Sequence, residues 1–132
     1  MVTYLWIALG SALGGMARHA SAGLVAAWFG HSFPLGTLLI NVLGSFVIGF
    51  FAALTAPGGR VAASPDMRQF VMVGVCGGYT TFSAFSLQTL TLAQNGELFR
   101  AGLNVGASVV LCLAAVWLGY AAGAALGAAR AN

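Results

Sequence analysis

The sequence predicts an all-α membrane protein with four transmembrane helices, the third of them broken near its middle. Of its 132 residues, 60% are hydrophobic and 5% are charged, and the mean hydropathy is +0.94. Soluble domains carry about 25% charged residues, so this chain could not cover a surface that faces water. Apolar segments of about 20–25 residues, each long enough to cross a bilayer, use nearly the whole length and predict one domain over residues 1–132.

The first half of the chain contains two of these segments. The first covers about 3–28 and is interrupted by Arg18 and His19. The peptide "GHSFP" ends it, and Pro34 suits the start of the next helix because its fixed φ fits the first helical turn. The second segment covers about 35–56. Both are expected to be helices that cross the membrane.

The second half follows a loop rich in proline, glycine and serine, "PGGRVAASPD" at 57–66. The third segment covers about 67–93 and contains the peptide "GGYTTFSAF". After the turn "AQNGELFR", the fourth segment covers about 100–128. With four spans, both chain ends and the 57–66 loop are expected on one side of the membrane.

The arginines set no clear orientation for these helices. Arg60, Arg68 and Arg130 are expected on the side of the chain ends, and Arg100 on the other side, joined by Arg18 if its side chain reaches the surface. Orientation follows an excess of basic residues on the cytoplasmic side, and three arginines on one side against two on the other are too small an excess to predict it. The count fits a chain that inserts both ways and pairs with itself, or one whose topology is set by local context.

Glycines recur at four-residue spacing in the first, third and fourth segments. Such small residues let helices approach closely in lipid, where packing drives association. We therefore expect a tightly packed bundle, with a dimer as a further expectation. The glycines concerned are Gly10/Gly14, Gly74/Gly78, Gly102/Gly106 and Gly119/Gly123/Gly127.

Two stripes of polar side chains lie inside the expected helices. Thr37, Asn41 and Ser45 follow one another at intervals of four residues, and so do Asn104 and Ser108. This spacing puts each set on one helix face. Polar groups in a membrane cost free energy unless they are paired or face a cavity, so these residues are candidates for a functional site. They predict either the lining of a narrow polar path or hydrogen bonds that join neighbouring helices.

The acidic residues argue against several function classes. Asp66 and Glu97, the only two, fall in expected loops, so no carboxylate within a span carries a proton or binds a cation. No Ser/His/Asp set or metal-ligand spacing occurs, and we expect that the protein is not an enzyme. A path lined by amides and hydroxyls favours an anion. Arg18, the one charge within a span, either reaches the membrane surface through its long side chain or raises the anion concentration at a pore mouth.

The peptide "GGYTTFSAF" at 77–85 is poor helical material inside an apolar segment. We expect "GGYTT" to break the helix, which is tolerated at membrane depth only where protein or a water-filled cavity surrounds the backbone. The carbonyls freed by such a break are good ligands for a hard cation such as Na⁺. Beyond the break, Phe82 and Phe85 share one helix face. Their positive ring edges can approach a small anion, and simple core packing is the alternative.

Three peptides in this order, "ALGGMARH", "GTLLINVLGSFVIG" and "GVCGGYTTFSAFS", closely resemble the Fluc (CrcB) family of small bacterial fluoride channels. The resemblance extends over all four segments. It implies a dual-topology antiparallel homodimer in the bacterial inner membrane, with two pores that conduct fluoride passively out of the cell. It also implies that the third helix of each subunit is broken.

The resemblance assigns roles to individual residues of this chain. Phe82 and Phe85 match phenylalanines whose ring edges line the fluoride path, and Asn41 matches a pore asparagine. Thr37 matches a polar residue towards the pore mouth, and Ser108 matches a fourth-helix hydroxyl near the two rings.

A structural Na⁺ at the dimer centre is a further implication, held by backbone carbonyls at Gly77 and Thr80 of both subunits. Arg18 matches an arginine near the vestibule, the wide entrance of the pore. The chain departs from the family at His19, where an aromatic residue is frequent, and at Tyr79, where an apolar one is common. Asn104 is within the family's range of residues at its position.

Two other functions remain as alternatives. A small multidrug transporter is also short, four-spanning and capable of dual topology, but it needs a membrane-embedded acid in its first helix, which this sequence lacks. A structural subunit of a larger membrane complex fits the short loops and the glycine stripes. It leaves the aligned polar stripes unexplained.

Overall fold

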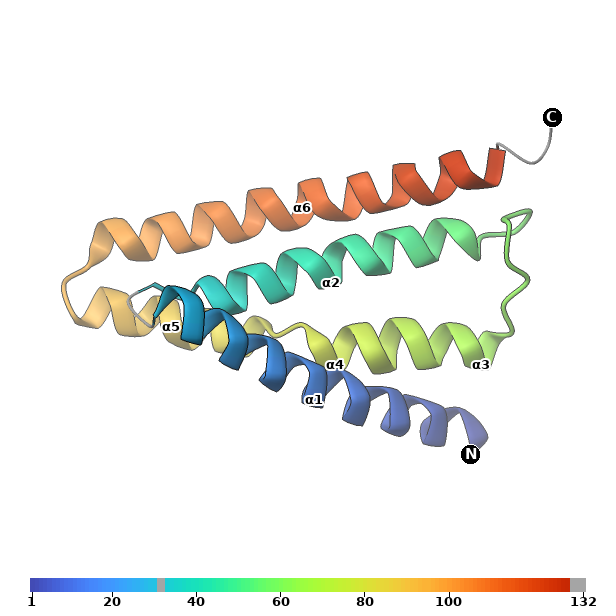
Figure 1. The fold of residues 1–132 in the computed structure, drawn as a ribbon, viewed down its shortest axis with the longest axis horizontal. Coiled ribbons are helices and arrows are strands. Elements are labelled where there is room, and N and C mark those ends of the chain that lie inside the picture. The colour runs from blue at the N-terminus through green and yellow to red at the C-terminus, as the bar shows by residue number, and fades with distance from the viewer. Residues whose placement is uncertain (31–32, 129–132) are drawn as a thin grey trace.

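The computed structural model describes residues 1–30 and 33–128, which form an all-helical fold with no strand in those ranges (Figure 1). Four long helical stretches run up and down, and the third is divided into pieces. The predicted segment bounds agree with the observed ones to within two residues. The elements are α1 (Val2–Phe29), α2 (Leu35–Leu54), α3 (Pro65–Arg68), the π-helical η1 (Gln69–Cys76), α4 (Gly77–Tyr79), α5 (Phe82–Gln94) and α6 (Leu98–Ala128).

Within the described ranges, three of these stretches are long and apolar enough to cross a membrane: Leu35–Leu54, Pro65–Gln94 and Leu98–Gly127. Four membrane-spanning helices were predicted, and α1 is not among these three. With 28 residues, α1 has the length, since a helix rises about 1.5 Å per residue. Its second half carries Arg18, His19 and Ser21, which lower its apolar character.

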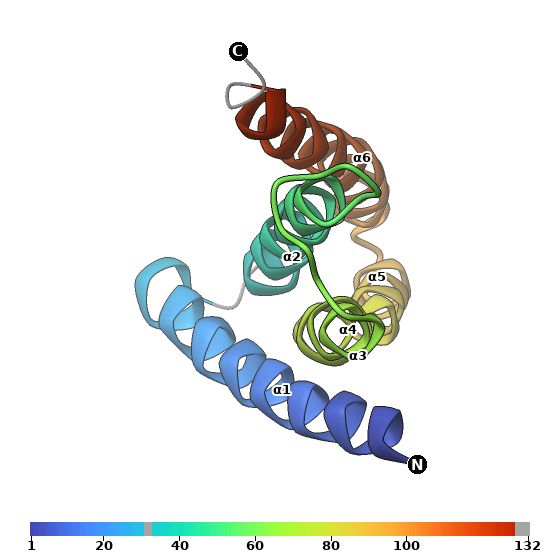
Figure 2. The same ribbon diagram turned by 90° about the vertical axis from the view of Figure 1, so that its right-hand side faces the viewer.

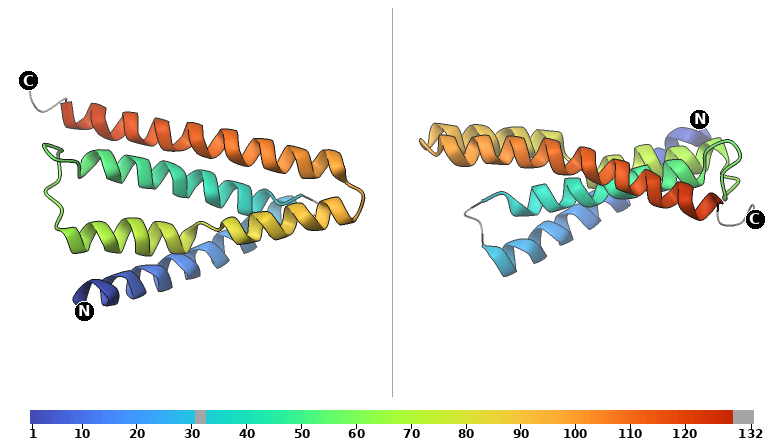
Figure 3. Two further views of the ribbon diagram at one scale, coloured as in Figure 1. Left: turned by 180° about the vertical axis from the view of Figure 1, so that it is seen from behind. Right: turned by 90° about the horizontal axis from the view of Figure 1, so that it is seen from above.

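The helices pack in two close pairs. The first helix, α1, lies against η1 and α4, while α2 runs beside α6 over most of its length. Seen end-on, α2 occupies the middle, with α6 on one side and α1 on the other (Figure 2). The remaining piece, α5, packs mainly against α6 and only lightly against α2 (Figure 3).

Glycines make these close approaches possible, as their spacing predicted. A β-carbon added at Gly74 would lie 2.9 Å from the Cα of Gly10, and one at Gly119 would overlap the carbonyl oxygen of Phe46 on α2. Gly102 and Gly106 behave differently, because an added β-carbon there meets nothing within 4 Å in a single subunit. The expected glycine packing thus holds for the α1–η1 and α2–α6 contacts and not for Gly102 and Gly106, nor for Gly127 near the end of α6.

One end of the bundle gathers the start of α1, the end of α6 and the loop between α2 and α3 (Figure 1). Polar contacts fasten this end. Arg68 Nη1 donates to the carbonyl of Thr55 at 2.7 Å and also to the Thr55 hydroxyl, so a cation sits at the C-terminus of α2, where it offsets the helix dipole. Thr3 Oγ1 donates to Asp66 Oδ1 at 2.7 Å and ties α1 to α3. Arg130 lies outside the described residues.

Candidate functional site

The break in the third helix is the centre of the site. Thr80 and Thr81 have extended backbone, with φ −82° and ψ 159° at Thr80 and φ −154° and ψ 110° at Thr81. The break predicted within "GGYTT" is present, but it lies at Thr80 and Thr81. Gly77 and Gly78 remain helical, so the expectation that the glycines themselves interrupt the helix is wrong. The small size of Gly78 serves packing instead: a β-carbon there would lie 2.7 Å from the carbonyl oxygen of Ser11 on α1.

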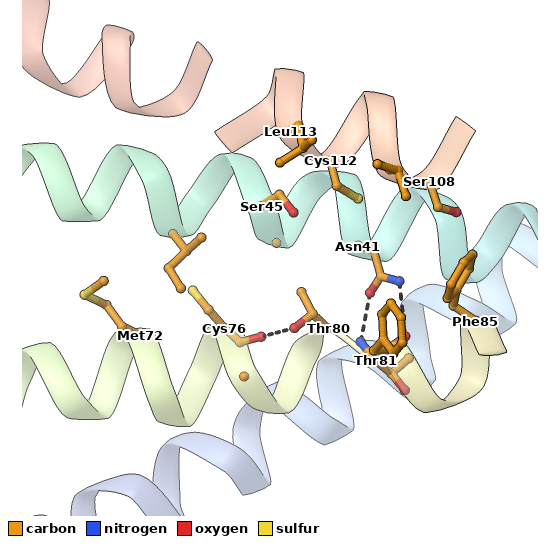
Figure 4. Close-up of a pocket in the computed structure, with 15 residues that line it drawn as sticks. Asn41, Ser45, Met72, Cys76, Thr80, Thr81, Phe85, Ser108, Cys112 and Leu113 are labelled. Atoms are coloured by element: carbon orange, nitrogen blue, oxygen red, sulfur yellow. Dashed lines mark hydrogen bonds between the residues drawn. The ribbon is translucent and has the colours of Figure 1, made fainter. Parts of the chain in front are cut away.

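Asn41 on α2 holds the break in place. Its Nδ2 donates to the carbonyl of Thr81 at 3.1 Å, and its Oδ1 accepts from the N–H of Thr81 at 2.8 Å (Figure 4). One side-chain amide thereby satisfies both backbone groups of an extended residue that would otherwise be costly to bury. Gly44, one turn along α2, permits this approach, since a β-carbon there would overlap Thr80 Cγ2.

The threonines themselves close the two helix ends at the break. The N–H and the Oγ1 of Thr80 each donate to the carbonyl of Cys76 at 2.9 Å, which completes the last turn of α4. Thr81 Oγ1 accepts from the N–H of Ala84 at 3.2 Å and caps the N-terminus of α5.

These side-chain bonds take two amide protons away from the main chain. In a continuous helix, the N–H of Thr81 would donate to Gly77 and that of Ala84 would donate to Thr80. Here the first goes to Asn41 Oδ1 and the second to Thr81 Oγ1. The carbonyls of Gly77 and Thr80, the two residues matched to the Na⁺ site, therefore both lose their usual helical donors. Oxygen ligands of this kind suit Na⁺ or another hard cation.

A cavity of about 440 Å³ lies beside the break, between α2, the third helix and α6 (Figure 4). It brings together six of the eight residues to which the family resemblance assigned a role. They are Asn41, Phe82, Phe85, Ser108, Gly77 and Thr80. Ser45, from the predicted stripe on α2, also lines it.

The two phenyl rings stand next to each other at the rim of this cavity. Their centroids are 5.1 Å apart and the ring planes are tilted by 49°. Phe85 is 8% exposed, whereas Phe82 is 77% exposed in the single subunit. A buried ring and an open ring thus form one continuous aromatic wall.

The polar stripe on α6 divides between two tasks. Ser108 is buried and lines the cavity. Asn104, one turn earlier, lines neither of the two cavities, and its Nδ2 donates to Thr89 Oγ1 of α5 at 2.9 Å. The sequence left open whether Asn104 lines a polar path or joins neighbouring helices, and this bond to α5 supports the second alternative.

Thr37 lies apart from the rest of its stripe, in a second cavity of about 280 Å³. His19 of α1 and Gln88 of α5 share this cavity with it. Gln88 was not singled out from the sequence, although it follows Phe85 by one turn. Its Oε1 is buried and, among the described residues, has no hydrogen-bond partner. Arg18 is half-buried on α1 and lines neither cavity.

The described residues contain no group of three or more His, Cys, Asp or Glu side chains placed to hold a metal ion. A broken helix, held open by an amide and bordered by an aromatic wall, defines a multi-pass helical protein with a cavity whose mostly apolar lining carries a few polar groups.

A family model makes the assignment specific. The model of CrcB-like protein, Camphor Resistance (CrcB), matches residues 5–120. The chain therefore belongs to the CrcB family, as the resemblance of its motifs predicted.

Relatives of the chain carry the name fluoride-specific ion channel FluC. The protein from Opitutus terrae is 57% identical over 132 residues and covers 100% of both chains. The protein from Rhodospirillum rubrum is 61% identical over 119 residues, which is 90% of this chain and 92% of the relative. The protein from Methylocella silvestris is 58% identical over 123 residues, 93% of this chain and 94% of the relative.

These relatives bear on two further predictions. They are named as ion channels, which confirms the expectation that the chain is not an enzyme. Family membership and the membrane-spanning helices also confirm a multi-pass protein of the bacterial inner membrane.

Proposed function

We propose that this protein is a fluoride-selective channel that lets fluoride leave the cytoplasm passively, through two pores of an antiparallel dimer. The observation that carries the proposal is the cavity beside the break. It brings Asn41, Ser108 and the pair Phe82 and Phe85 to one place, in a chain whose relatives are named fluoride-specific ion channels.

The groups around the cavity suit a small, strongly hydrated anion. The Ser108 hydroxyl can donate to it, and Asn41 has a second N–H on Nδ2 beyond the one that binds Thr81. The ring edges of Phe82 and Phe85 add weak positive potential. No fully charged side chain lines this cavity, so bound fluoride would meet enough donors to enter and no fixed cation to trap it.

The second cavity supplies an entrance on the same side of the bundle as the turn between α5 and α6. Thr37 and Gln88 offer amide and hydroxyl groups there, and His19 stands at the edge on α1. Arg18, beside His19, raises the local anion concentration without contacting the ion. We assign this cavity as the vestibule of the pore.

An antiparallel second copy would complete the pore. Phe82 is 77% exposed in one subunit and lines a cavity that needs another wall. The charges permit both orientations: Arg68 is engaged by Thr55 at one end, and Arg100 forms an ion pair with Glu97 at 2.6 Å at the other. Two such breaks, meeting at the dimer centre, would offer the carbonyls of Gly77 and Thr80 from both subunits to a structural Na⁺.

The alternatives fit the structure less well. A proton-coupled transporter of cationic drugs needs an acid inside a span, whereas Asp66 lies at the start of α3 and Glu97 in the turn before α6. A purely structural subunit would have no use for a cavity that gathers Asn41 and Ser108 beside a broken helix.

The direct test is ion efflux from liposomes that contain the purified protein. We expect rapid fluoride efflux down its gradient, little chloride efflux from matched vesicles, and no effect of an imposed pH gradient. An ion-selective electrode reports the release of each ion. Equal fluoride and chloride rates, or no fluoride release from protein that is folded and dimeric, would exclude the proposed function.

A further inference from the structure

The helix that carries the two phenyl rings is weakly attached to the rest of the subunit. Beyond the break, α5 packs mainly against α6 and only lightly against α2. Two polar anchors compensate for this. The first is the pair of bonds between Asn41 and Thr81, and the second is the bond between Asn104 and Thr89. Phe82 and Phe85 lie between these anchors along α5.

The second anchor is a relay of two hydrogen bonds that ends on the backbone of Phe85. Asn104 is 1% exposed, and its Nδ2 donates to Thr89 Oγ1 at 2.9 Å. The same hydroxyl donates its own proton to the carbonyl of Phe85 at 2.8 Å. A threonine hydroxyl has one donor and two acceptor sites, so it can serve both bonds at once.

The relay joins the two walls of the cavity. Asn104 precedes Ser108 by one turn of α6, which places the two side chains on the same helix face. One end of the relay is therefore tied to the helix that presents Ser108, and the other end to the residue that presents the buried ring. A slide or rotation of α5 against α6 would break the bond between Asn104 and Thr89.

We propose that Asn104 and Thr89 are positioning residues. They hold the Phe85 ring in a fixed position relative to Ser108, and this position sets the preference of the pore for fluoride. Neither residue lines the main cavity, so neither needs to touch the ion. This inference rests on the proposed function, and it assigns a task to a polar pair outside the path.

The test compares variants that differ by the Thr89 hydroxyl alone. Thr89→Ala and Thr89→Ser differ in one oxygen atom, and Thr89→Val keeps the branched shape without the hydroxyl. In liposomes, we expect Thr89→Ala and Thr89→Val to slow fluoride efflux at least fivefold and to reduce the ratio of fluoride to chloride efflux. We expect Thr89→Ser to stay within twofold of the wild type in both quantities.

The matched control is Thr91 on the same helix. Its Oγ1 donates to the carbonyl of Leu87 at 2.9 Å, the same kind of local bond, but the side chain is exposed. Thr91→Ala and Thr91→Val should leave both the fluoride rate and the ion ratio unchanged.

Size-exclusion chromatography and the thermal unfolding midpoint establish that each variant is a folded dimer. If Thr89→Val does not assemble, the Ala and Ser variants carry the comparison by themselves. Wild-type rate and wild-type selectivity in folded Thr89→Ala would overturn the positioning role, as would an equal loss in the Thr91 variants. A wild-type protein that fails to conduct fluoride would instead overturn the proposed function.

Discussion

At the scale of single residues, Asn41 combines a structural task with the functional one that we propose for it. Its amide pairs with both backbone groups of Thr81, and the remaining N–H is free to face the cavity. Phe82 and Phe85 divide their tasks differently, because one ring is open and the other is enclosed. The proposed function requires that both rings act through their edges. Substitutions that remove the ring but keep an apolar side chain distinguish this role from simple packing.

We expect Phe82→Ile and Phe85→Ile each to slow fluoride efflux about tenfold, equivalent to about 1.4 kcal/mol in the barrier, because an aliphatic side chain has no positive ring edge. The measurement is electrode-detected efflux from liposomes with equal amounts of dimer. Phe99→Ile is the matched control, since Phe99 is 83% exposed on α6 and lines neither cavity. Unchanged efflux in one of the two pore variants would identify that ring as a packing residue.

At the scale of elements, the third helix depends on its neighbours for its shape. The stretch from η1 to α4 is pressed against α1 through Gly74 and Gly78, and the break is pressed against α2 through Gly44. Overpacking of a well-packed contact costs about 1–3 kcal/mol, because the backbone has to shift. The contact at Gly44 therefore controls how closely Asn41 approaches Thr81.

Gly44→Ala should lower the stability of the folded subunit by about 1–3 kcal/mol and reduce fluoride efflux, since the added methyl overlaps Thr80 Cγ2. The thermal unfolding midpoint in detergent and the liposome rate report the two effects. Gly15→Ala provides the control, because an added β-carbon at Gly15 meets nothing within 4 Å. If Gly44→Ala lowers stability and efflux no more than Gly15→Ala does, the break tolerates a wider spacing between α2 and the third helix.

At the scale of the whole molecule, the nearly even placement of charge at the two ends underlies the proposed antiparallel dimer. The loop before α3 exposes Val61 and Ala62, and the turn before α6 exposes Gln94 and Asn95. Lysines substituted at these exposed positions would remain at the surface. Basic residues favour the cytoplasmic side, so added lysines should choose one orientation for every copy.

We expect Val61→Lys with Ala62→Lys to lock one orientation, and Gln94→Lys with Asn95→Lys to lock the opposite one. Each double variant expressed alone should give little fluoride efflux, since it lacks an antiparallel partner, and co-expression of the two should restore it. Cysteine labelling from one side of the membrane verifies the orientations. Full efflux from a single locked variant would contradict the antiparallel dimer.

The helices could be predicted from sequence because long apolar runs separated by turn residues determine them almost alone. The exact position of the break could not, because Gly77 and Gly78 both stay helical despite the low helix propensity of glycine, and Gly78 packs tightly against Ser11 of α1. Asn104 and Ser108 share a helix face, so the sequence does not distinguish them. The structure shows that Asn104 hydrogen-bonds to α5, whereas Ser108 lines the cavity. Gln88 was missed because a single amide in an apolar run carries no periodic signal.

The interruption at Thr80 and Thr81 also creates an electrostatic pattern in the middle of the subunit. Aligned peptide dipoles give a helix about half a positive charge at its first turn and about half a negative charge at its last. The 13-residue helix α5 begins at Phe82, so its positive pole coincides with the aromatic wall, while the negative pole of α4 ends at Tyr79 among the freed carbonyls. In the proposed pore, an anion and a cation would thereby meet adjacent regions of opposite potential, built from peptide groups that no change of pH can discharge.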